Sequence, residues 1–210
     1  PRWPLIMMFG LYPLWWALGL VDIMWFFMAA AMLLYLRRRA AIQVPRGFGL
    51  WLLFLLWALV SVIELDTALR LVGFTYRYGL YLACTVLFIY VYNSPEKVTG
   101  KFVTGLCSVF WLVTVVGGYL GLRFPAKVFV TPMTKILPQA LERNELINQM
   151  VVRRFAQYNP DSYFQLPPRP SAPFLYTNNW GNVFSLLLPL VVVHLVLTRG
   201  ERKFWLLLAA

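Results

Sequence analysis

The sequence has little charge, one histidine and two cysteines, and each scarcity excludes a class of protein. Only 13% of the 210 residues are charged, whereas 60% are hydrophobic. A water-soluble domain cannot bury so much apolar surface, so that class is excluded. Cys84 and Cys107 form no CxxC pair and have no metal-ligand neighbours, which indicates small apolar residues. The sequence lacks a glycine-rich phosphate loop, a nucleophile elbow and paired catalytic carboxylates, and we expect no metal and no cofactor.

Apolar runs of about 20 residues recur along the chain, and this length spans the core of a bilayer. They predict an all-α fold, a polytopic transmembrane helical bundle with about seven spans. The first apolar stretch is too long for one upright span, and Gly10, Pro13 and Gly19 divide it. The expected helices cover about residues 4–18, 20–36, 47–63, 71–92, 102–122 and 174–197, and a seventh begins at Phe204.

The basic residues predict the orientation of these spans. Arg37, Arg38, Arg39 and Arg46 lie in a short loop without an acidic residue, which is typical of a cytoplasmic loop. The loops near residues 93–97 and 199–203 are then cytoplasmic too, and residues 123–172 form a long extracytoplasmic loop. Topology therefore explains much of the +11 net charge, and we expect membrane lipids rather than nucleic acid as partners.

The ends of the sequence suggest a fragment. The chain starts at Pro1, and its last apolar run reaches Ala210 without a polar flank. We expect residues 1–210 to be part of a single membrane domain.

The long loop is expected to contain an amphipathic helix. Apolar residues recur at helical spacing from Leu137 to Phe155, with Arg153 among the polar residues of the opposite side. Such a helix can lie flat on the outer leaflet, close over a cavity, or pack on its neighbours as an ordinary surface helix.

The stretch from Arg169 to Asn182 joins this polar loop to the sixth apolar run. Its prolines exclude a helix and favour an extended backbone, and Thr177 and Asn178 are suited to cap the helix that follows. The first turns of that helix are polar, which is costly against lipid. They either face protein or a wet cavity, or form an interfacial cap; the residues are Asn178, Asn179, Asn182 and Ser185.

Arg70 and Arg77 lie two helical turns apart on one face of the fourth span. An arginine several residues inside a span is costly unless it snorkels to the interface or meets an anion. Two structural interpretations compete with an anion site, since Tyr76 and Tyr78 suit an interface belt and Asp66 is placed to pair with Arg70.

Guanidinium groups bind phosphate oxygens in pairs of hydrogen bonds and remain charged at any working pH. We therefore predict a pyrophosphate-binding set at the outer side, made of Arg169, Arg77, Arg70, Asn178 and Asn179. His194 is expected near the cytoplasmic end of its helix as a packed or interfacial residue. Asp22 is expected to cap a helix rather than to take part in catalysis.

Three segments of the chain resemble the O-antigen ligase and Wzy-type polymerase superfamily, particularly its actinobacterial branch. They are Tyr12-Pro13-Leu14-Trp15-Trp16-Ala17-Leu18-Gly19, then Val44-Pro45-Arg46-Gly47-Phe48, and above all Arg169 followed by Phe174-Leu175-Tyr176-Thr177-Asn178-Asn179-Trp180-Gly181. The resemblance covers nearly the whole chain, as the amino-terminal half of a family member.

The resemblance implies a metal-independent, inverting glycosyltransferase in a bacterial cytoplasmic membrane, crossing it several times. Such an enzyme transfers or polymerises a glycan from an undecaprenyl-pyrophosphate carrier to a glycan or lipid acceptor on the outer face. Arg169 would then hold the pyrophosphate leaving group, with help from Arg70 or Arg77. The family's catalytic histidine lies in a second outer loop beyond Ala210, so the catalytic residues are unknown and these residues alone are expected to be inactive. Two alternatives are a lipid-linked glycan flippase or other transporter, and a non-catalytic membrane scaffold.

Overall fold

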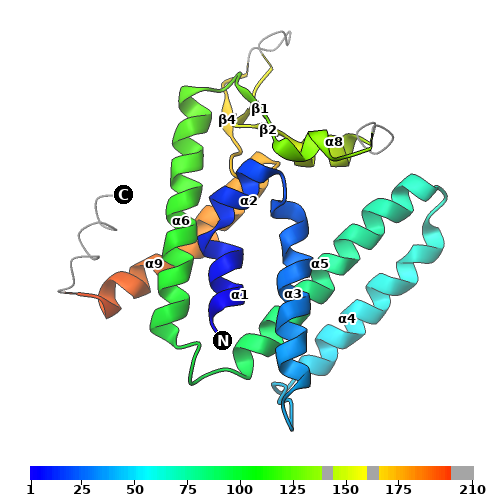
Figure 1. Ribbon diagram of the computed structural model, residues 1–210, viewed down its shortest axis with the longest axis vertical. Helices are drawn as coiled ribbons and strands as arrows, with labels where there is room; N and C mark the ends of the chain where they lie inside the picture. The colour runs from blue at the N-terminus through cyan, green and yellow to red at the C-terminus, as the bar shows by residue number, and fades with distance from the viewer. Residues whose placement is uncertain (139–143, 160–165, 200–210) are drawn as a thin grey trace. The chain divides into compact units, whose positions relative to one another are not determined.

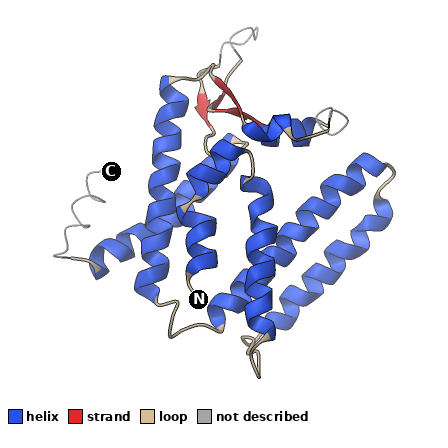
Figure 2. Cartoon of the chain, in the orientation of Figure 1, coloured by secondary structure: helices blue, strands red, loops and turns tan. Residues whose placement is uncertain are grey.

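A computed structural model describes residues 1–138, 144–159 and 166–199 of the chain. These residues are mostly helical, and the short strands all belong to the loop between the last two long helices (Figures 1 and 2). The predicted helical fold class is therefore confirmed. Contacts divide the chain into two compact units, Pro1–Pro4 with Ile23–Val98 and Leu5–Asp22 with Thr99–Ala210.

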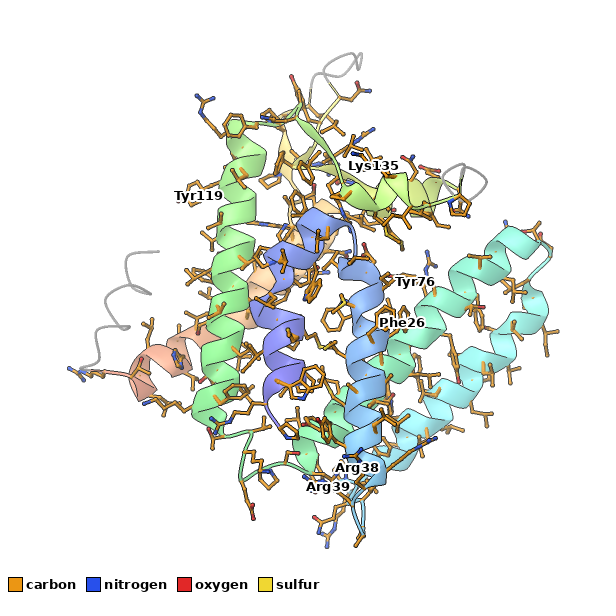
Figure 3. All side chains as sticks on the ribbon, viewed as in Figure 1. Phe26, Arg38, Arg39, Tyr76, Tyr119 and Lys135 are labelled. Atoms are coloured by element: carbon orange, nitrogen blue, oxygen red, sulfur yellow. The ribbon has the colours of Figure 1, made fainter. Side chains whose placement is uncertain are left out.

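The first unit consists mainly of three helices. They are α3 (Val21–Arg37, in this unit from Ile23 onward), α4 (Phe48–Val60) with a 3-10 turn at Ser61–Glu64, and α5 (Ala68–Tyr92). Figure 1 shows α4 and α5 as a helical hairpin, and Trp51 Nε1 donates a hydrogen bond to Thr85 Oγ1 across it at 2.8 Å. Phe26 of α3 packs edge-on against Tyr76 of α5, with ring centroids 5.9 Å apart (Figure 3).

The second unit is built around α6 (Gly100–Arg123) and α9 (Thr177–Leu197), which pack against each other. A π-helical turn at Ile6–Gly10 and the helix α2 (Tyr12–Leu18) complete the helical layer, and the one-turn helix α1 (Trp3–Leu5) precedes them. The aromatic ring of Phe110 lies 4.7 Å from that of Tyr12 and 6.0 Å from that of Phe174. This aromatic cluster joins α2, α6 and the loop before α9 into one core.

The loop between α6 and α9 is folded. Strand β1 (Val128–Val130) pairs antiparallel with β2 (Val152–Arg154), and β3 (Ala156–Gln157) pairs antiparallel with β4 (Arg169–Pro170). A 3-10 turn at Pro132–Lys135 and the helix α8 (Glu145–Val151) lie between β1 and β2. Figure 2 shows the strands gathered beside the carboxyl end of α6.

The apolar helices lie close to their predicted positions. Three of them are long and apolar enough to cross a membrane: Arg70–Tyr92, Gly100–Arg123 and Thr177–Leu197. The apolar helix at Phe48–Glu64 is shorter. Seven spans stay a prediction, and the run that begins at Phe204 lies outside the described residues.

The amphipathic helix of the loop is shorter than the sequence suggests. Part of the predicted helix, residues 139–143, lies outside the described residues, and α8 begins at Glu145 and ends at Val151. The prediction that the helix continues to Phe155 is wrong, because Val152–Arg154 form a strand. β-branched residues favour extended backbone, and the pairing with β1 supplies hydrogen bonds that a helix would otherwise make internally.

Candidate functional site

A face of small residues on α6 positions the proline-rich segment that contains Arg169, residues 167–173, which we call the arm. A Cβ atom added at Gly117 would lie 2.2 Å from the carbonyl oxygen of Ala172, and one at Gly121 would lie 2.5 Å from that of Phe155. Only glycine allows the backbone of the arm to approach the helix this closely. The backbone N–H groups of Ser171 and Ala172 both donate to the Phe155 carbonyl, at 3.1 Å each. The arm is therefore held against α6 by backbone contacts.

The same face of α6 receives the start of α9. A Cβ at Gly118 would lie 2.6 Å from the Trp180 ring, whose Nε1 donates to the Thr114 carbonyl at 2.8 Å. The α6–α9 packing thus places the helix that follows Arg169 directly beside the arm.

Arg169 is fixed through its backbone. It lies in β4 opposite Gln157 of β3, and its carbonyl accepts a hydrogen bond from the Thr177 hydroxyl at 3.3 Å. Thr177 is the first residue of α9, so this hydrogen bond connects the helix to the arm. The helix cap is Tyr176, without a side-chain hydrogen bond, so the sequence prediction of capping by Thr177 or Asn178 is wrong.

The side chain of Arg169 lines a cavity of about 500 Å³ within the folded loop. Among the described residues, the charged members of the lining are three arginines and one glutamate, Arg153, Arg154, Arg169 and Glu145. Amide and phenol groups supply much of the rest of the polar lining, from Asn148, Gln149, Gln157, Tyr158, Asn159 and Tyr176. The volume falls in the range of pockets that hold small molecules, and the formal charges favour an anion.

Arg153 is neutralised within the protein. Its side chain is 2% exposed, and one of its terminal nitrogens donates to Asp22 Oδ2 at 2.7 Å. Asp22 lies in the first turn of α3, where the sequence placed it, and forms this ion pair. The pair joins two segments of the second unit and contributes a fixed, largely compensated charge to the cavity wall.

Arg154 and Arg169 are different, because both are exposed and neither has a side-chain hydrogen bond or ion pair within the described part of the chain. A chain of hydrogen bonds joins other residues of the cavity lining. The Tyr176 hydroxyl donates to Gln149 Oε1 at 2.9 Å, and Gln149 Nε2 donates to Glu145 Oε1 at 3.1 Å. The arrangement can bind an anion beside groups that exchange hydrogen bonds with hydroxyls.

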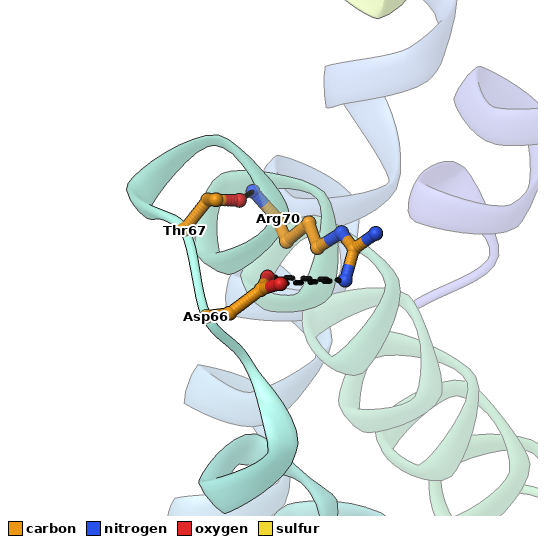
Figure 4. A network of polar contacts seen from close by, with 3 residues as sticks. All are labelled: Asp66, Thr67 and Arg70. Carbon is orange, nitrogen blue, oxygen red and sulfur yellow. Dashed lines mark hydrogen bonds and ion pairs between the residues drawn. The ribbon is translucent and has the colours of Figure 1, made fainter.

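The other predicted site residues lie elsewhere. Arg70 is at the start of α5 in the first unit and pairs with Asp66 at 3.0 Å, with both side chains about two-thirds exposed, at 66% and 64% (Figure 4). This is the structural interpretation that the sequence left open. Arg77 is an exposed residue of the same helix. Its grouping with Arg169 joins residues of different units and stays a prediction.

Asn178 and Asn179 are exposed on the first turn of α9, and Asn182 and Ser185 are exposed further along the helix. Among the described residues that line the cavity, neither asparagine is present. Their predicted role in anion binding therefore rests on the sequence.

His194 is a packed residue. It is buried between α9 and α6, with its Nδ1 3.1 Å from the Thr104 hydroxyl, and a Cβ at Gly105 would lie 3.0 Å from its ring. The described residues include no group of three or more histidine, cysteine or acidic side chains placed to hold a metal ion. Cys84 and Cys107 are free thiols.

Sequence reasoning missed Arg154, Gln149 and Gln157 as cavity residues and assigned Arg153 to the polar side of a helix. The β-branched run from Val151 to Val152 was the available signal for a strand, and a strand alternates its side chains between two faces. Nothing in the sequence indicated that Arg153 would meet Asp22, which is 131 positions away.

Comparisons with known protein families, with curated proteins and with solved structures find no match for this chain.

Proposed function

We propose that this chain belongs to a membrane glycosyltransferase that transfers or polymerises a glycan from an undecaprenyl-pyrophosphate carrier on the outer face of the membrane. In this proposal, the cavity of the folded loop binds the pyrophosphate group through Arg169 and Arg154. The acceptor is a hydroxyl of a glycan or lipid. The family resemblance of the Arg169–Gly181 segment suggests the reaction class.

One observation above all supports the proposal. Two arginines without an ion pair in the described part of the chain line the same cavity as Arg153, whose charge Asp22 compensates. With Glu145 as the acidic residue among the described residues of that lining, this part of the cavity has a surplus of positive charge. Guanidinium groups are suited to pyrophosphate because they form paired hydrogen bonds to phosphate oxygens.

The position of the cavity in the chain favours a lipid-linked anion. The loop connects α6 and α9, and both helices are long and apolar enough to cross a membrane. A polyprenyl chain can therefore lie beside apolar helices while its pyrophosphate reaches the loop. The amide and tyrosine groups of the cavity suit the hydroxyls of the attached sugar.

The proposed chemistry needs cations at the leaving group. The acceptor oxygen forms a bond to the anomeric carbon, and the bond from that carbon to the pyrophosphate oxygen breaks. The carrier pyrophosphate leaves with the electron pair, and the acceptor hydroxyl gives up its proton to a base. Because negative charge grows on the leaving group, fixed guanidinium groups stabilise the transition state more than the ground state.

The transporter alternative expects cations along the depth of a central pathway. In α6 the basic residues are Lys101 and Arg123, near its two ends, and α9 has neither lysine nor arginine. Pro189 lies inside α9 and suits a moving helix as well as a static kink. The distribution of charge therefore favours a site in the loop over a charged pathway through these helices.

The test measures binding and transfer in the full-length protein. Arg169→Ala should weaken binding of farnesyl pyrophosphate, a short-chain polyprenyl pyrophosphate, by about tenfold or more, because a charged hydrogen bond is lost. Transfer should fall by roughly thirty- to a thousand-fold, and Arg169→Lys should recover only part of it.

Arg123→Ala is the matched control, because it removes an exposed arginine near the same loop that does not line the cavity among the described residues. It should leave both binding and transfer nearly unchanged. A folded Arg169→Ala protein with wild-type binding and transfer would show that the proposed site is wrong.

A further inference from the structure

A second cavity lies in the first unit, at the end of the α4–α5 hairpin that is away from Arg70. It has a volume of about 360 Å³ and lies between the α3–α4 loop and the turn after α5. The lining is mostly polar and includes Arg39, Gln43, Tyr92, Ser94, Glu96 and Lys97.

Buried hydrogen bonds hold the two sides of this cavity together. The Asn93 side chain accepts from the Gln43 N–H and donates to the Gln43 and Ile89 carbonyls, each at 2.8 Å. Asn93 and Ser94 are buried, and Arg39 donates to the Ser94 hydroxyl at 3.1 Å. This network fixes the backbone of both loops, so less entropy is lost when a ligand binds.

The charge around the cavity is strongly positive. Residues 37–47 and 93–97 together contain five basic residues and one acidic residue, Glu96. Arg38 and Arg39 are at the carboxyl end of α3 (Figure 3). Within the described residues Lys97 has no ion pair, and Arg39 uses one terminal nitrogen for Ser94.

Apolar surface surrounds these cations. Ile42 and Val44 are exposed in the α3–α4 loop, and Tyr92 is exposed at the end of α5. The adjoining helix α4 exposes a run of large apolar side chains, with Leu50 75% exposed. Exposed apolar side chains beside basic residues are typical of a segment at the lipid–water interface.

We propose that this cavity binds the phosphate of an anionic phospholipid headgroup, with Arg39 and Lys97 as the principal ligands. The exposed apolar residues then contact the acyl chains of the lipid. A soluble phosphate has no acyl chains and cannot make these contacts. The site is independent of the pyrophosphate cavity and does not depend on the proposed transferase function.

A diffuse attraction of a basic loop to an anionic surface is the competing explanation. Such attraction contributes about 1 kcal/mol for each basic residue near the surface, whichever residue it is. A specific binding site makes a different prediction. Basic residues that line the cavity must then contribute more to the lipid affinity than equally charged residues beside it.

The experiment titrates phosphatidylglycerol into the detergent-solubilised chain and counts bound lipids by native mass spectrometry. Phosphatidylcholine and inorganic phosphate serve as the two other probes. Arg39→Gln and Lys97→Gln should each lower phosphatidylglycerol affinity about tenfold, because each removes a charged hydrogen bond. Arg38→Gln is the matched control, since Arg38 has the same charge in the same loop and is not in the described lining of the cavity. It should lower the affinity by less than about fivefold.

The two variants distinguish a loss of lipid binding from a loss of structure, because Lys97→Gln leaves the Arg39–Ser94 hydrogen bond in place. One tightly bound phosphatidylglycerol that phosphatidylcholine does not replace supports the proposal. Equal losses for Arg38→Gln and Arg39→Gln would overturn it in favour of diffuse attraction. Displacement of the lipid by an equal concentration of inorganic phosphate would overturn the assignment to a lipid.

Discussion

The arginines of α5 and those of the α6–α9 loop share their chemistry but differ in their surroundings. Arg70 and Arg77 project from a single helix into exposed positions, and Asp66 already pairs with Arg70. Arg153, Arg154 and Arg169 come from strands β2 and β4 and line one cavity. A single helix places such residues on neighbouring turns along its length, whereas a folded loop directs side chains from distant positions in the chain toward one place.

The difference also appears between two adjacent residues of β2. Both residues line the same cavity, but Arg153 is buried and paired with Asp22, whereas Arg154 is exposed. A run of basic residues therefore does not define a binding site. Burial and the presence of an internal anion decide which arginine remains able to bind a ligand.

The largest expected effect concerns the sides of the membrane on which the two loops lie. In a chain whose own cysteines are replaced by alanine, Ala40→Cys should react with an impermeant thiol reagent only after the inner face is opened. Lys127→Cys, in the α6–α9 loop, should react from outside in intact cells. The positive-inside rule gives the physical reason. Reaction of position 127 from the cytoplasmic side alone would contradict the predicted orientation.

Removal of the buried arginine should have the next largest effect. Arg153→Ala removes the ion pair with Asp22 at 2.7 Å and should lower the free energy of unfolding by about 3 kcal/mol. Arg154→Ala is the matched control on the adjacent residue and should change stability by less than about 0.5 kcal/mol. Thermal unfolding of the detergent-solubilised chain measures both. Equal effects of the two substitutions would show that the ion pair does not hold the loop in place.

Disturbing the close approach of the arm to α6 should have a smaller effect on stability. Gly117→Ala places a methyl group 2.2 Å from the Ala172 carbonyl oxygen and should destabilise the chain by about 1–3 kcal/mol. Gly181→Ala adds the same methyl group to α9, where nothing lies within 4 Å of it, and should be neutral or slightly stabilising. Thermal unfolding and farnesyl pyrophosphate binding should both respond at Gly117. A neutral Gly117→Ala variant would show that the arm does not lie against α6.

The α5 arginines should have the smallest effects. Arg70→Ala removes an exposed ion pair and should change stability by less than about 1 kcal/mol. If Arg77 meets an anion, Arg77→Lys should bind farnesyl pyrophosphate more weakly than the wild type and Arg77→Ala weaker still, by about fivefold. Wild-type binding by Arg77→Lys would indicate that this arginine snorkels to the interface.

Much of the helical framework was predictable because it depends on local properties of the chain. Apolar length, proline and glycine marked α3, α5, α6 and α9 to within a few residues. The break near Gly19 was predictable too, because its φ of 81° is a conformation that glycine adopts without strain. The sequence also singled out Arg169, which lies between prolines before an apolar run, and its role in anion binding stays a prediction.

The sequence by itself determined the helical class, the positions of the long apolar helices and the presence of an arginine on a stiff arm. Each of these follows from interactions among residues that are near in the chain. The tertiary structure alone decided that Arg153 is neutralised by Asp22 and that Gly117 and Gly121 receive the arm. It also decided that Arg154 and Arg169 line one cavity. These outcomes depend on contacts between distant segments, because strand pairing and close backbone packing bring together residues whose separation no local pattern encodes.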